Sequence, residues 1–511
     1  MARRTPKRLV TPRGMGSVAV QLGHVATCGL FVIFSVSEGV RSVLRFLSAL
    51  SLLCLSLTAV AASPPISDQL AKRIDADVQT VLQRTGTPGA TILIAEHGRS
   101  VYRRAYGLRD RERHVPATVD SHYEIGSITK QFTAAAILQL QEAGKLHLDD
   151  KLSTYLPSAP HASEVTLRQL LSHTGGMPEY LDAVDAAKAI DKPASFDKLM
   201  SYIAGKPLDF PPGSHWSYSN TGYILAGRVI EVASHESYWH YVQTHLLDPA
   251  GMTHTFTVAE ENTLPNMAIG YDREHGQIEP ARTIAASVGW AAGFLVSTID
   301  DLEKWNTALR SGKIVTPADY VLMTTSVKTA QGDTGYGLGL FVDGIDDQPR
   351  IGHTGGSLGF TTANEYFPRQ GTQVIAFTNF VDNPEPGETI TAAIFEDLNP
   401  AIAAAAMRPS AGEDPAVTAK AKAYFAQLQA GDQDSPYLAP KLNKKMKAGL
   451  AKHLAGEFKG YGQPTAFVFK GRHTDAGKTF SDYVIRFGPG RLLKFGVALD
   501  GNGKIASISL G

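Results

Sequence analysis

The chain has 511 residues with 49 basic and 49 acidic side chains, so its formal net charge is zero. This balance argues against a protein that coats nucleic-acid phosphates, because such proteins carry excess positive charge. The composition, 43% apolar and 19% charged, is that of a globular protein, and at about 150 residues per domain the length suggests roughly two to four domains. Both cysteines, Cys28 and Cys54, lie near the N-terminus, so we expect no disulfide, thiolate nucleophile or cysteine metal site elsewhere.

Residues 1–62 have the composition of a targeting segment. Two arginines precede an apolar run over 46–60, and small alanines follow it, which is the pattern of a secretory signal peptide. A second apolar stretch over 18–36 leaves two interpretations open, a membrane anchor or a start codon placed too far upstream. We favour the second, because this stretch is short and interrupted by polar residues. We therefore expect a periplasmic or secreted protein, with membrane association only through this segment.

The segments that follow predict a sheet covered by helices. Apolar residues at helical spacing predict a helix over 66–84, and two strand-like runs joined by His97-Gly98-Arg99 predict a hairpin. A long middle section alternates short helices with loops rich in glycine and proline. The hairpin is expected over 90–96 and 100–106, two later strands over 360–367 and 372–380, and a closing helix over 388–398.

Residues 403–415 are small, polar and flanked by proline, which is typical of a linker. We therefore expect one domain over 63–402 and a small α+β domain over 416–511, without a recognisable catalytic constellation. In the small domain we expect helices over 416–428 and 442–454, followed by strands over 465–469, 483–487, 492–498 and 505–510.

The first candidate for chemistry is Gly126-Ser127-Ile128-Thr129-Lys130, at the start of a helix rich in alanine and leucine. Positions three apart share a helix face, so the Ser127 hydroxyl and the Lys130 ammonium are expected to lie together. A serine is a poor nucleophile without a base, and a partly buried lysine can be that base. The helix N-terminus adds free N–H groups where an oxyanion would form. A second Ser-x-x-Lys, Ser195 to Lys198, lies in a polar run, and we interpret it as a helix start.

The second candidate is Tyr218-Ser219-Asn220, in a loop before a helix expected over 224–232. A phenol near a lysine can move protons if its pKa is depressed. The Asn220 amide can bond both a lysine and a substrate carbonyl. The alternative is an asparagine that caps a helix beside a packing tyrosine, and these residues alone leave both interpretations open.

The third candidate is Gly352-His353-Thr354-Gly355-Gly356, just ahead of the strand expected over 360–367. A glycine-rich strand edge lets backbone N–H groups approach a substrate closely. The same His-Thr-Gly-Gly sequence also occurs over 173–176. That copy follows a predicted helix, so we interpret it as a turn.

In this order, the three motifs resemble those of the serine β-lactamase and penicillin-binding protein superfamily, which are Ser-x-x-Lys, Ser- or Tyr-x-Asn, and Lys-Thr-Gly. The Tyr-x-Asn form resembles the class C β-lactamase branch, which includes D-amino-acid-specific peptidases, DD-carboxypeptidases and esterases. The resemblance covers roughly residues 66–400. It implies an α/β (α+β) fold of the β-lactamase/transpeptidase type, with an antiparallel sheet flanked by helices and a helical region.

The resemblance also implies a serine hydrolase that works through an acyl-enzyme. Ser127 would be acylated, and Lys130 would assist its deprotonation. Tyr218 would move protons to the leaving group and activate the hydrolytic water, with Asn220 orienting the substrate. The backbone N–H groups of Ser127 and Gly356 would form the oxyanion hole.

The substrate-binding strand departs from the family pattern at one position. His353, Thr354, Gly355 and Gly356 would line the substrate site, but the family's β-lactamases have lysine where this chain has His353. An unperturbed histidine is mostly uncharged near neutral pH, so attraction for a substrate carboxylate should be weaker. The departure favours a peptidase- or esterase-like relative. We expect a small-molecule or peptide substrate, including peptidoglycan-like peptides, and no nucleic acid, metal or organic cofactor.

An α/β-hydrolase is a competing interpretation, because residues 355–359 match its Gly-x-Ser-x-Gly elbow with Ser357 as nucleophile. The elbow requires a helix immediately after the serine, and the residues that follow Ser357 are strand-like. Downstream partners could be Asp382 or Asp397 with His453 or His473.

Two further interpretations concern metals and binding. His235, His240 and His245 are spaced by five, unlike the i,i+4 pair of a zinc protease, so we interpret them as a solvated helix face. A binding protein that kept the fold and lost the chemistry is the remaining alternative. Such degeneration usually removes the serine or the lysine, and both Ser127 and Lys130 are present.

Overall fold

The computed structural model describes residues 65–345, 347–382, 385–458 and 460–510 of the chain. The targeting segment expected over 1–62 lies outside the described residues. Within the described ranges, no helix combines the length and the apolar character needed to cross a membrane.

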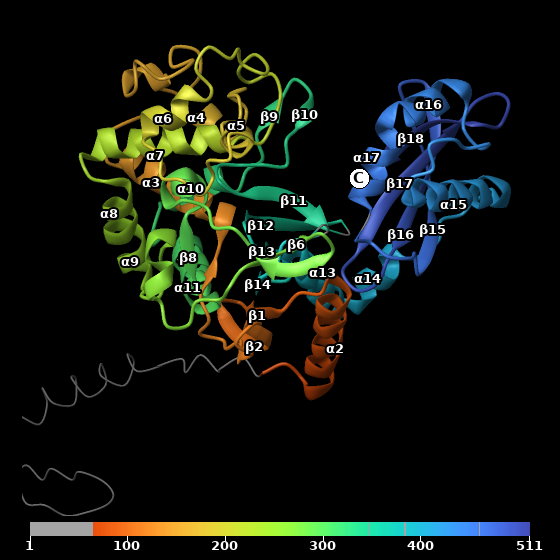
Figure 1. Cartoon of the computed structure of the whole chain (residues 1–511), viewed down its shortest axis with the longest axis horizontal. Helices are drawn as coiled ribbons and strands as arrows, with labels where there is room; N and C mark the ends of the chain where they lie inside the picture. Colours follow the sequence, from red (N-terminus) through yellow and green to blue (C-terminus); the bar gives the residue numbers. More distant parts are fainter. Residues whose placement is uncertain (1–64, 346, 383–384, 459, 511) are drawn as a thin grey trace, which may run out of the picture. The chain divides into compact units, whose positions relative to one another are not determined.

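A seven-stranded antiparallel sheet forms the centre of the larger part of the chain (Figure 1). The strand order is β11-β12-β13-β14-β1-β2-β3, so β1 pairs with β14 on one side and with β2 on the other. The N-terminal hairpin and the late strands are therefore one sheet. Its strands are β1 (Gly89–Glu96), β2 (Arg99–Asp110), β3 (Val115–Pro116), β11 (Phe341–Ile345), β12 (Gln348–Ser357), β13 (Phe360–Phe367) and β14 (Thr372–Thr378).

Local sequence explains the first hairpin. His97 and Gly98 have φ values of 49° and 76°, the left-handed conformation that a two-residue hairpin turn needs. Strand β1 is buried on both faces, with Ile92 and Ile94 in one core and Leu93 in the other, as alternation along a strand requires. The hairpins expected around residue 97 and over 360–380 are both confirmed.

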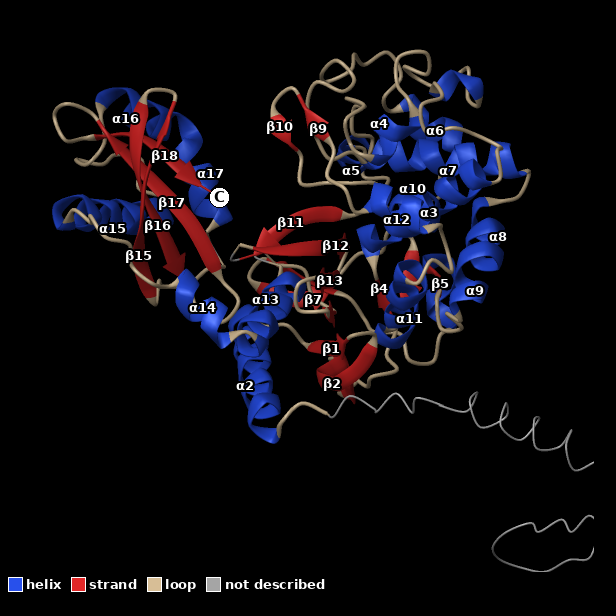
Figure 2. Cartoon of the chain, turned by 180° about the vertical axis from the view of Figure 1, so that it is seen from behind, coloured by secondary structure: helices blue, strands red, loops and turns tan. Residues whose placement is uncertain are grey.

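Helices cover both faces of the sheet (Figure 2). On one face α2 and α13 pack against each other, and Ile74 and Ile390 join the core that contains Ile92. On the other face α11 packs against β1 and β14. The expected first and closing helices are confirmed as α2 (Asp68–Thr85) and α13 (Pro386–Leu398), with α11 spanning Ile299–Arg310.

A helical region is built around α3, which is buried over most of its length, with the polar Lys130 and Gln131 buried as well as its apolar residues. Helix α3 packs against α7, α8 and α10. The region contains η2 (Gly126–Ile128), α3 (Thr129–Glu142), α4 (Leu167–Leu171), α5 (Leu181–Ala186), α6 (Phe196–Ser201), α7 (Asn220–Ser234), α8 (Tyr238–Val242), α9 (Asp248–Ala250), α10 (Ala286–Gly293) and α12 (Pro317–Met323). Short strands accompany it: β4 (Tyr123–Glu124), β5 (Phe256–Thr257) and β8 (Leu295–Ser297) in one sheet, β6 (Tyr271–Glu274) with β7 (Gln277–Pro280), and β9 (Lys328–Thr329) with β10 (Gly332–Asp333).

Residues 415–510 form a four-stranded antiparallel sheet with helices and a hydrophobic core of their own. The helix and strand types expected here are confirmed, although the first two strands are longer than expected. Residues 403–406, inside the expected linker, belong to α14 (Pro400–Ala406), because a run of alanines favours helix and proline suits the first turn. The elements are α15 (Pro415–Ala430), α16 (Pro440–Lys445), α17 (Ala451–Glu457), β15 (Ala466–Asp475), β16 (Lys478–Arg486), β17 (Leu492–Leu499) and β18 (Ile505–Leu510).

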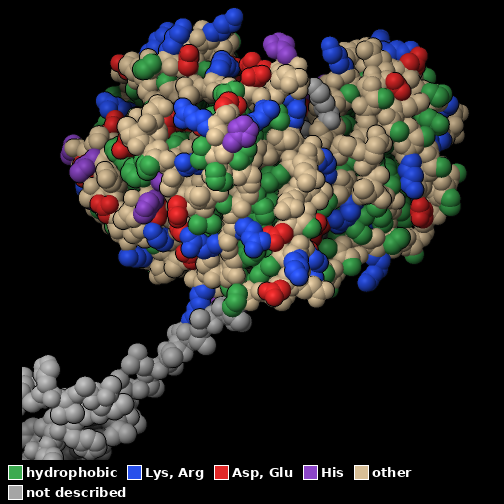
Figure 3. Space-filling model, turned by 60° about the horizontal axis from the view of Figure 1, so that its bottom comes forward, with side chains coloured by type: hydrophobic (Ala, Val, Ile, Leu, Met, Phe, Trp, Pro, Cys, Tyr) green, Lys and Arg blue, Asp and Glu red, His purple; other side chains and the backbone are tan. Residues whose placement is uncertain are grey.

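Charges of both signs are mixed on the surface. The face drawn in Figure 3 shows lysine and arginine interspersed with aspartate and glutamate. Exposed pairs such as Arg168 with Asp149, at 2.8 Å, follow the same pattern. Charges of both signs are therefore distributed over the face that is drawn.

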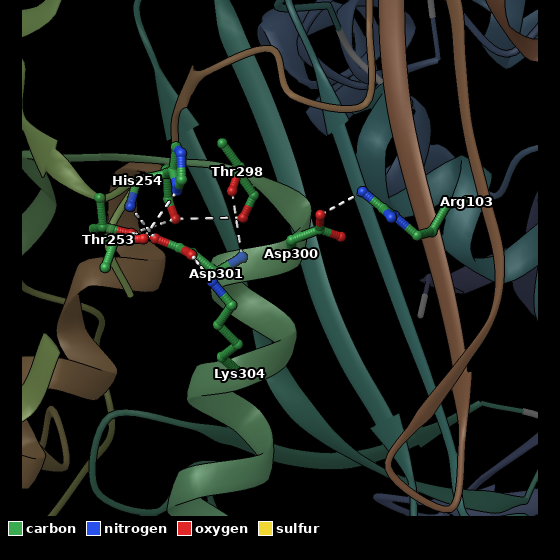
Figure 4. Close-up of polar contacts among 9 residues, drawn as sticks. Arg103, Thr253, His254, Thr298, Asp300, Asp301 and Lys304 are labelled. Carbon is green, nitrogen blue, oxygen red and sulfur yellow. Dashed lines mark hydrogen bonds and ion pairs between the residues drawn. The ribbon is translucent and has the colours of Figure 1, made fainter. Parts of the chain in front are cut away.

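Asp301 joins α11 to the chain segment that leads into β5 (Figure 4). Its buried carboxylate accepts hydrogen bonds from the His254 backbone N–H at 2.6 Å and from the Thr255 hydroxyl at 3.0 Å. It also pairs with Lys304 at 2.7 Å. Asp300, the preceding residue, points instead toward Arg103 at the surface.

We predict that Asp301→Ala lowers the free energy of unfolding by about 2–4 kcal/mol, because buried donors lose a charged acceptor. The matched control is Asp300→Ala, which removes an exposed ion pair and should cost less than about 1 kcal/mol. Urea unfolding followed by circular dichroism measures both variants. Equal losses would contradict a specific role for the buried carboxylate.

Candidate active site

Ser127 lies in the short turn that leads into α3. It is the middle residue of η2, and α3 begins two residues later at Thr129. Lys130 follows in the first turn of α3 and is completely buried. Its Nζ donates a hydrogen bond of 2.9 Å to Ser127 Oγ. The two side chains therefore face each other, as their spacing in the sequence predicts.

The Lys130 side chain ends among oxygen atoms from three different elements. Besides Ser127 Oγ, its Nζ donates to Asn220 Oδ1 at 2.9 Å and to the Ala292 carbonyl at 2.8 Å. Burial lowers the pKa of Lys130 to about 7, against the opposing effect of the negative charge on Glu179. A large fraction of Lys130 is therefore unprotonated near neutral pH and can accept the proton of Ser127.

Tyr218 is a further neighbour of Lys130. The Lys130 Nζ is 4.8 Å from the centre of the Tyr218 ring. Burial raises the pKa of Tyr218 far more than the neighbouring Ser127 side chain lowers it. A depressed pKa, the condition stated above for a phenol that moves protons, is therefore not met. Tyr218 stays protonated, so it can relay a proton through its hydroxyl but does not begin as a phenolate.

Asn220 is the first residue of α7, which begins four residues earlier than expected. Its side-chain oxygen accepts from Lys130, and its backbone N–H donates to Glu179 Oε2 at 2.6 Å. The other oxygen of Glu179 accepts from the Leu181 N–H at 2.8 Å. Sequence reasoning missed Glu179, although it is the one carboxylate in the otherwise uncharged stretch 169–181.

His353 lies on β12 with only 2% of its surface exposed. Its Nδ1–H donates to the Thr354 carbonyl at 2.5 Å, which leaves Nε2 to accept from the Tyr336 hydroxyl at 2.9 Å. Burial, with a smaller effect from Lys130, lowers the pKa of His353 to about 3. The side chain is therefore neutral at neutral pH. A cavity of about 220 Å³ lies beside His353 and Thr354 and is also lined by Arg350.

Glycines let β12 touch the turn that carries Ser127. A Cβ on Gly355 would lie 2.0 Å from the Ile125 carbonyl oxygen, and a Cβ on Gly126 would lie 2.5 Å from the Gly356 oxygen. Gly126 also has a φ of +49°, which suits glycine. The backbones of these two segments are therefore in direct contact. They carry the N–H groups of Ser127 and Gly356, which the motif comparison assigns to an oxyanion hole.

His173 is a second residue that sequence reasoning left out of the site. The turn expected over 173–176 is present, since His173 follows α4 with a φ of 58°. Its ring centre lies 4.3 Å from that of Tyr218 and 4.6 Å from that of Tyr336. Its Nδ1 accepts the Ser219 N–H at 3.1 Å, so it helps to hold Tyr218 in place. The repeat of the His-Thr-Gly-Gly sequence was the signal that could have pointed to His173.

The structure gives the remaining candidates roles other than that of nucleophile or metal ligand. Ser195 caps α6, with its Oγ accepting the Lys198 N–H at 3.2 Å, which confirms the helix-start interpretation. Ser357 ends β12 and is followed by a turn and β13. The α/β-hydrolase alternative is therefore wrong, because a nucleophile elbow leads into a helix. His240 and His245 lie 3.7 and 3.2 Å from a carboxylate oxygen of Glu236.

Comparison with known proteins agrees with this geometry. The sequence model of the β-lactamase family matches residues 74–399, well over half of the chain. The penicillin-binding protein PbpX of Bacillus subtilis (strain 168) is 29% identical over 335 residues, which cover 65% of this chain and 81% of PbpX.

Two solved structures illustrate the structural likeness. A D-stereospecific amidohydrolase from Streptomyces sp. is 26% identical with a TM-score of 0.54, covering 60% of this chain and 94% of that one. The octameric penicillin-binding protein homologue from Pyrococcus abyssi has 24% identity and a TM-score of 0.58, covering 86% of this chain and 98% of that one, and shows similarity of fold. Together with the Ser127–Lys130–Asn220 arrangement, these matches show that the chain belongs to the β-lactamase family, within the superfamily of serine β-lactamases and penicillin-binding proteins.

Proposed function

We propose that the chain is an exported serine hydrolase that forms an acyl-enzyme at Ser127 on amide or ester substrates, with D-amino-acid derivatives as the preferred class. The observation that carries the proposal is the hydrogen bond between Ser127 and a buried Lys130 whose pKa is about 7. The export part rests on the sequence pattern of residues 1–62.

The reaction begins when Ser127 Oγ attacks the substrate carbonyl carbon and its proton passes to Lys130 Nζ. The carbonyl oxygen becomes an oxyanion facing the N–H groups of Ser127 and Gly356. As the bond to the leaving amine or alcohol breaks, the proton returns to that leaving group through the Tyr218 hydroxyl. Water then attacks the acyl-enzyme, giving its proton to the same relay and releasing the acid and free Ser127.

The neutral state of His353 supports a preference for substrates other than carboxylate-bearing β-lactams. With a pKa of about 3, His353 supplies no positive charge to bind a carboxylate near neutral pH. The likeness to a D-stereospecific amidohydrolase supports D-amino-acid amides and peptides as the first substrates to assay. Simple esters present the same carbonyl and serve as convenient probes.

The nucleophile is tested by intact-protein mass after treatment with a fluorophosphonate. We expect one adduct on the wild type and none on Ser127→Ala. Ser195→Ala is the matched control, because it removes the serine of the other Ser-x-x-Lys sequence and should keep the adduct. No adduct on folded wild-type protein would favour a binding protein that has lost the chemistry.

The base is tested by pH dependence. Lys130 must lose its proton to act, so kcat/KM for a chromogenic ester should rise with pH through about 7. Glu179→Gln removes the negative charge that raises the pKa of Lys130, so the rise should move to lower pH. Glu164→Gln, at an exposed carboxylate, is the control. A shift to higher pH in Glu179→Gln would refute this role for Lys130.

Substrate preference is tested at His353. His353→Lys should accelerate acylation by benzylpenicillin roughly tenfold or more, because a charged donor then faces the substrate carboxylate. His353→Gln stays neutral and should show no gain. A neutral ester assayed in parallel should not be hydrolysed faster by either variant. Unchanged or slower penicillin acylation in His353→Lys would show that the missing charge at residue 353 does not explain a low preference for carboxylate-bearing β-lactams.

A further inference from the structure

A buried side-chain hydrogen bond lies directly behind the two segments that approach each other at Ser127. Glu124 is the last residue of β4, three residues before Ser127, and is 2% exposed. Ser357 is the last residue of β12 and directly follows Gly356. The Ser357 hydroxyl donates to Glu124 Oε2. This bond therefore joins the two chain segments whose N–H groups would stabilise the oxyanion.

A second carboxyl group completes the cluster. Glu261, on the 3₁₀ helix η5 (Val258–Thr263), is 9% exposed, and its carboxyl lies near enough to that of Glu124 for the two to perturb each other's pKa. Two neighbouring carboxyl groups can share a hydrogen bond when one of them holds the proton. In the part of the chain that the structure describes, neither forms an ion pair with lysine or arginine. Burial raises the pKa of Glu124 well above its usual range, against the opposing effect of the Ser357 hydrogen bond and with a further rise from the neighbouring Glu261 carboxyl.

Other hydrogen bonds of the Ser127 turn lead to β13 and β8, so the role of the Ser357–Glu124 bond is distinct from theirs. Thr362 Oγ1 donates to the Ile125 carbonyl at 3.2 Å, and the Ile125 N–H donates to the Leu295 carbonyl at 2.9 Å. These bonds hold the chain just before Gly126. The Ser357–Glu124 bond holds the end of β12 just after Gly356, on the far side of the glycine contact.

We propose that Glu124 and Ser357 are positioning residues, whose hydrogen bond sets the spacing of the Ser127 and Gly356 N–H groups. The role rests on the proposed function, because an oxyanion hole matters only to an enzyme that forms a tetrahedral intermediate. Glu261 supports the arrangement by sharing a proton with Glu124. Once both carboxyls are ionised they repel each other, and the spacing loosens. Activity therefore declines at alkaline pH as the shared proton is lost.

The test compares Ser357→Ala, Glu124→Gln and Ser435→Ala with the wild type on a chromogenic ester. Ser435 is a matched control, since it is a buried serine whose hydroxyl donates to Gln427 within the C-terminal sheet-and-helix region. Ser357→Ala should lower kcat about 10- to 100-fold with little change in KM, because a misplaced donor affects the transition state most. The inhibition constant of a phenylboronic acid, whose adduct with serine carries a tetrahedral oxyanion-like centre, should rise by a similar factor.

Glu124→Gln is the conservative variant. Its amide oxygen can accept from Ser357 and its amide nitrogen can donate to Glu261, so kcat near neutral pH should be largely retained. The amide cannot ionise, so the decline of kcat at alkaline pH should disappear in this variant. A role confined to stability would not move this limb of the pH profile.

Three results would overturn the proposal. The first is wild-type kcat and boronate inhibition in Ser357→Ala, and the second is an unchanged alkaline limb in Glu124→Gln. If Ser357→Ala does not fold, the pH profile of Glu124→Gln still decides. The third is a folded wild type that gives no fluorophosphonate adduct, which refutes the proposed function and this role with it. If the wild type is active and both Ser357→Ala and Glu124→Gln behave like it, the positioning role is refuted and the proposed function stands.

Discussion

The burial of Lys130 is the constraint on which the site depends. An ammonium group inside a helix that is covered on nearly every side is costly unless oxygen atoms surround it. Here the oxygens come from η2, α7 and the end of α10, through Ser127, Asn220 and Ala292. The packing of α7 and α10 on α3 therefore supplies the oxygen atoms that surround Lys130, in addition to forming part of the core. The same burial brings the pKa of Lys130 to about 7, where a lysine can exchange protons.

Burial also decides which group near Ser127 carries charge. Burial shifts the pKa values of Lys130, Tyr218 and His353 in the direction that favours the neutral form of each side chain. The pKa values of Tyr218 and His353 shift so far that both side chains stay neutral at physiological pH. The negative charge of Glu179, in contrast, keeps the pKa of Lys130 within the physiological range. The site therefore contains one titrating base and two neutral hydrogen-bonding groups. This separation of roles comes from the environment and not from residue type.

Preorganisation of the site depends on backbone contact. Gly126 and Gly355 let two chain segments approach more closely than side chains would permit, so the donors on these segments are held by main-chain packing. A polar anchor, Ser357 with Glu124, lies immediately behind this contact. Aromatic packing of His173 on Tyr218 restrains the opposite side. Rigid support on both sides suits a site that must stabilise charge without rearranging.

Local sequence by itself determined the first hairpin, the closing helix, and the placement of Ser127 and Lys130 on one helix face, because each depends on turn chemistry or on spacing within one element. The order of the three motifs was also enough to indicate the family. Only the tertiary structure brought Glu179 to Lys130, His173 to Tyr218 and Glu124 to Ser357, since these partners come from separate segments. It also decided the protonation of Tyr218 and His353, because the pKa of a side chain depends on how completely the folded chain excludes water from it.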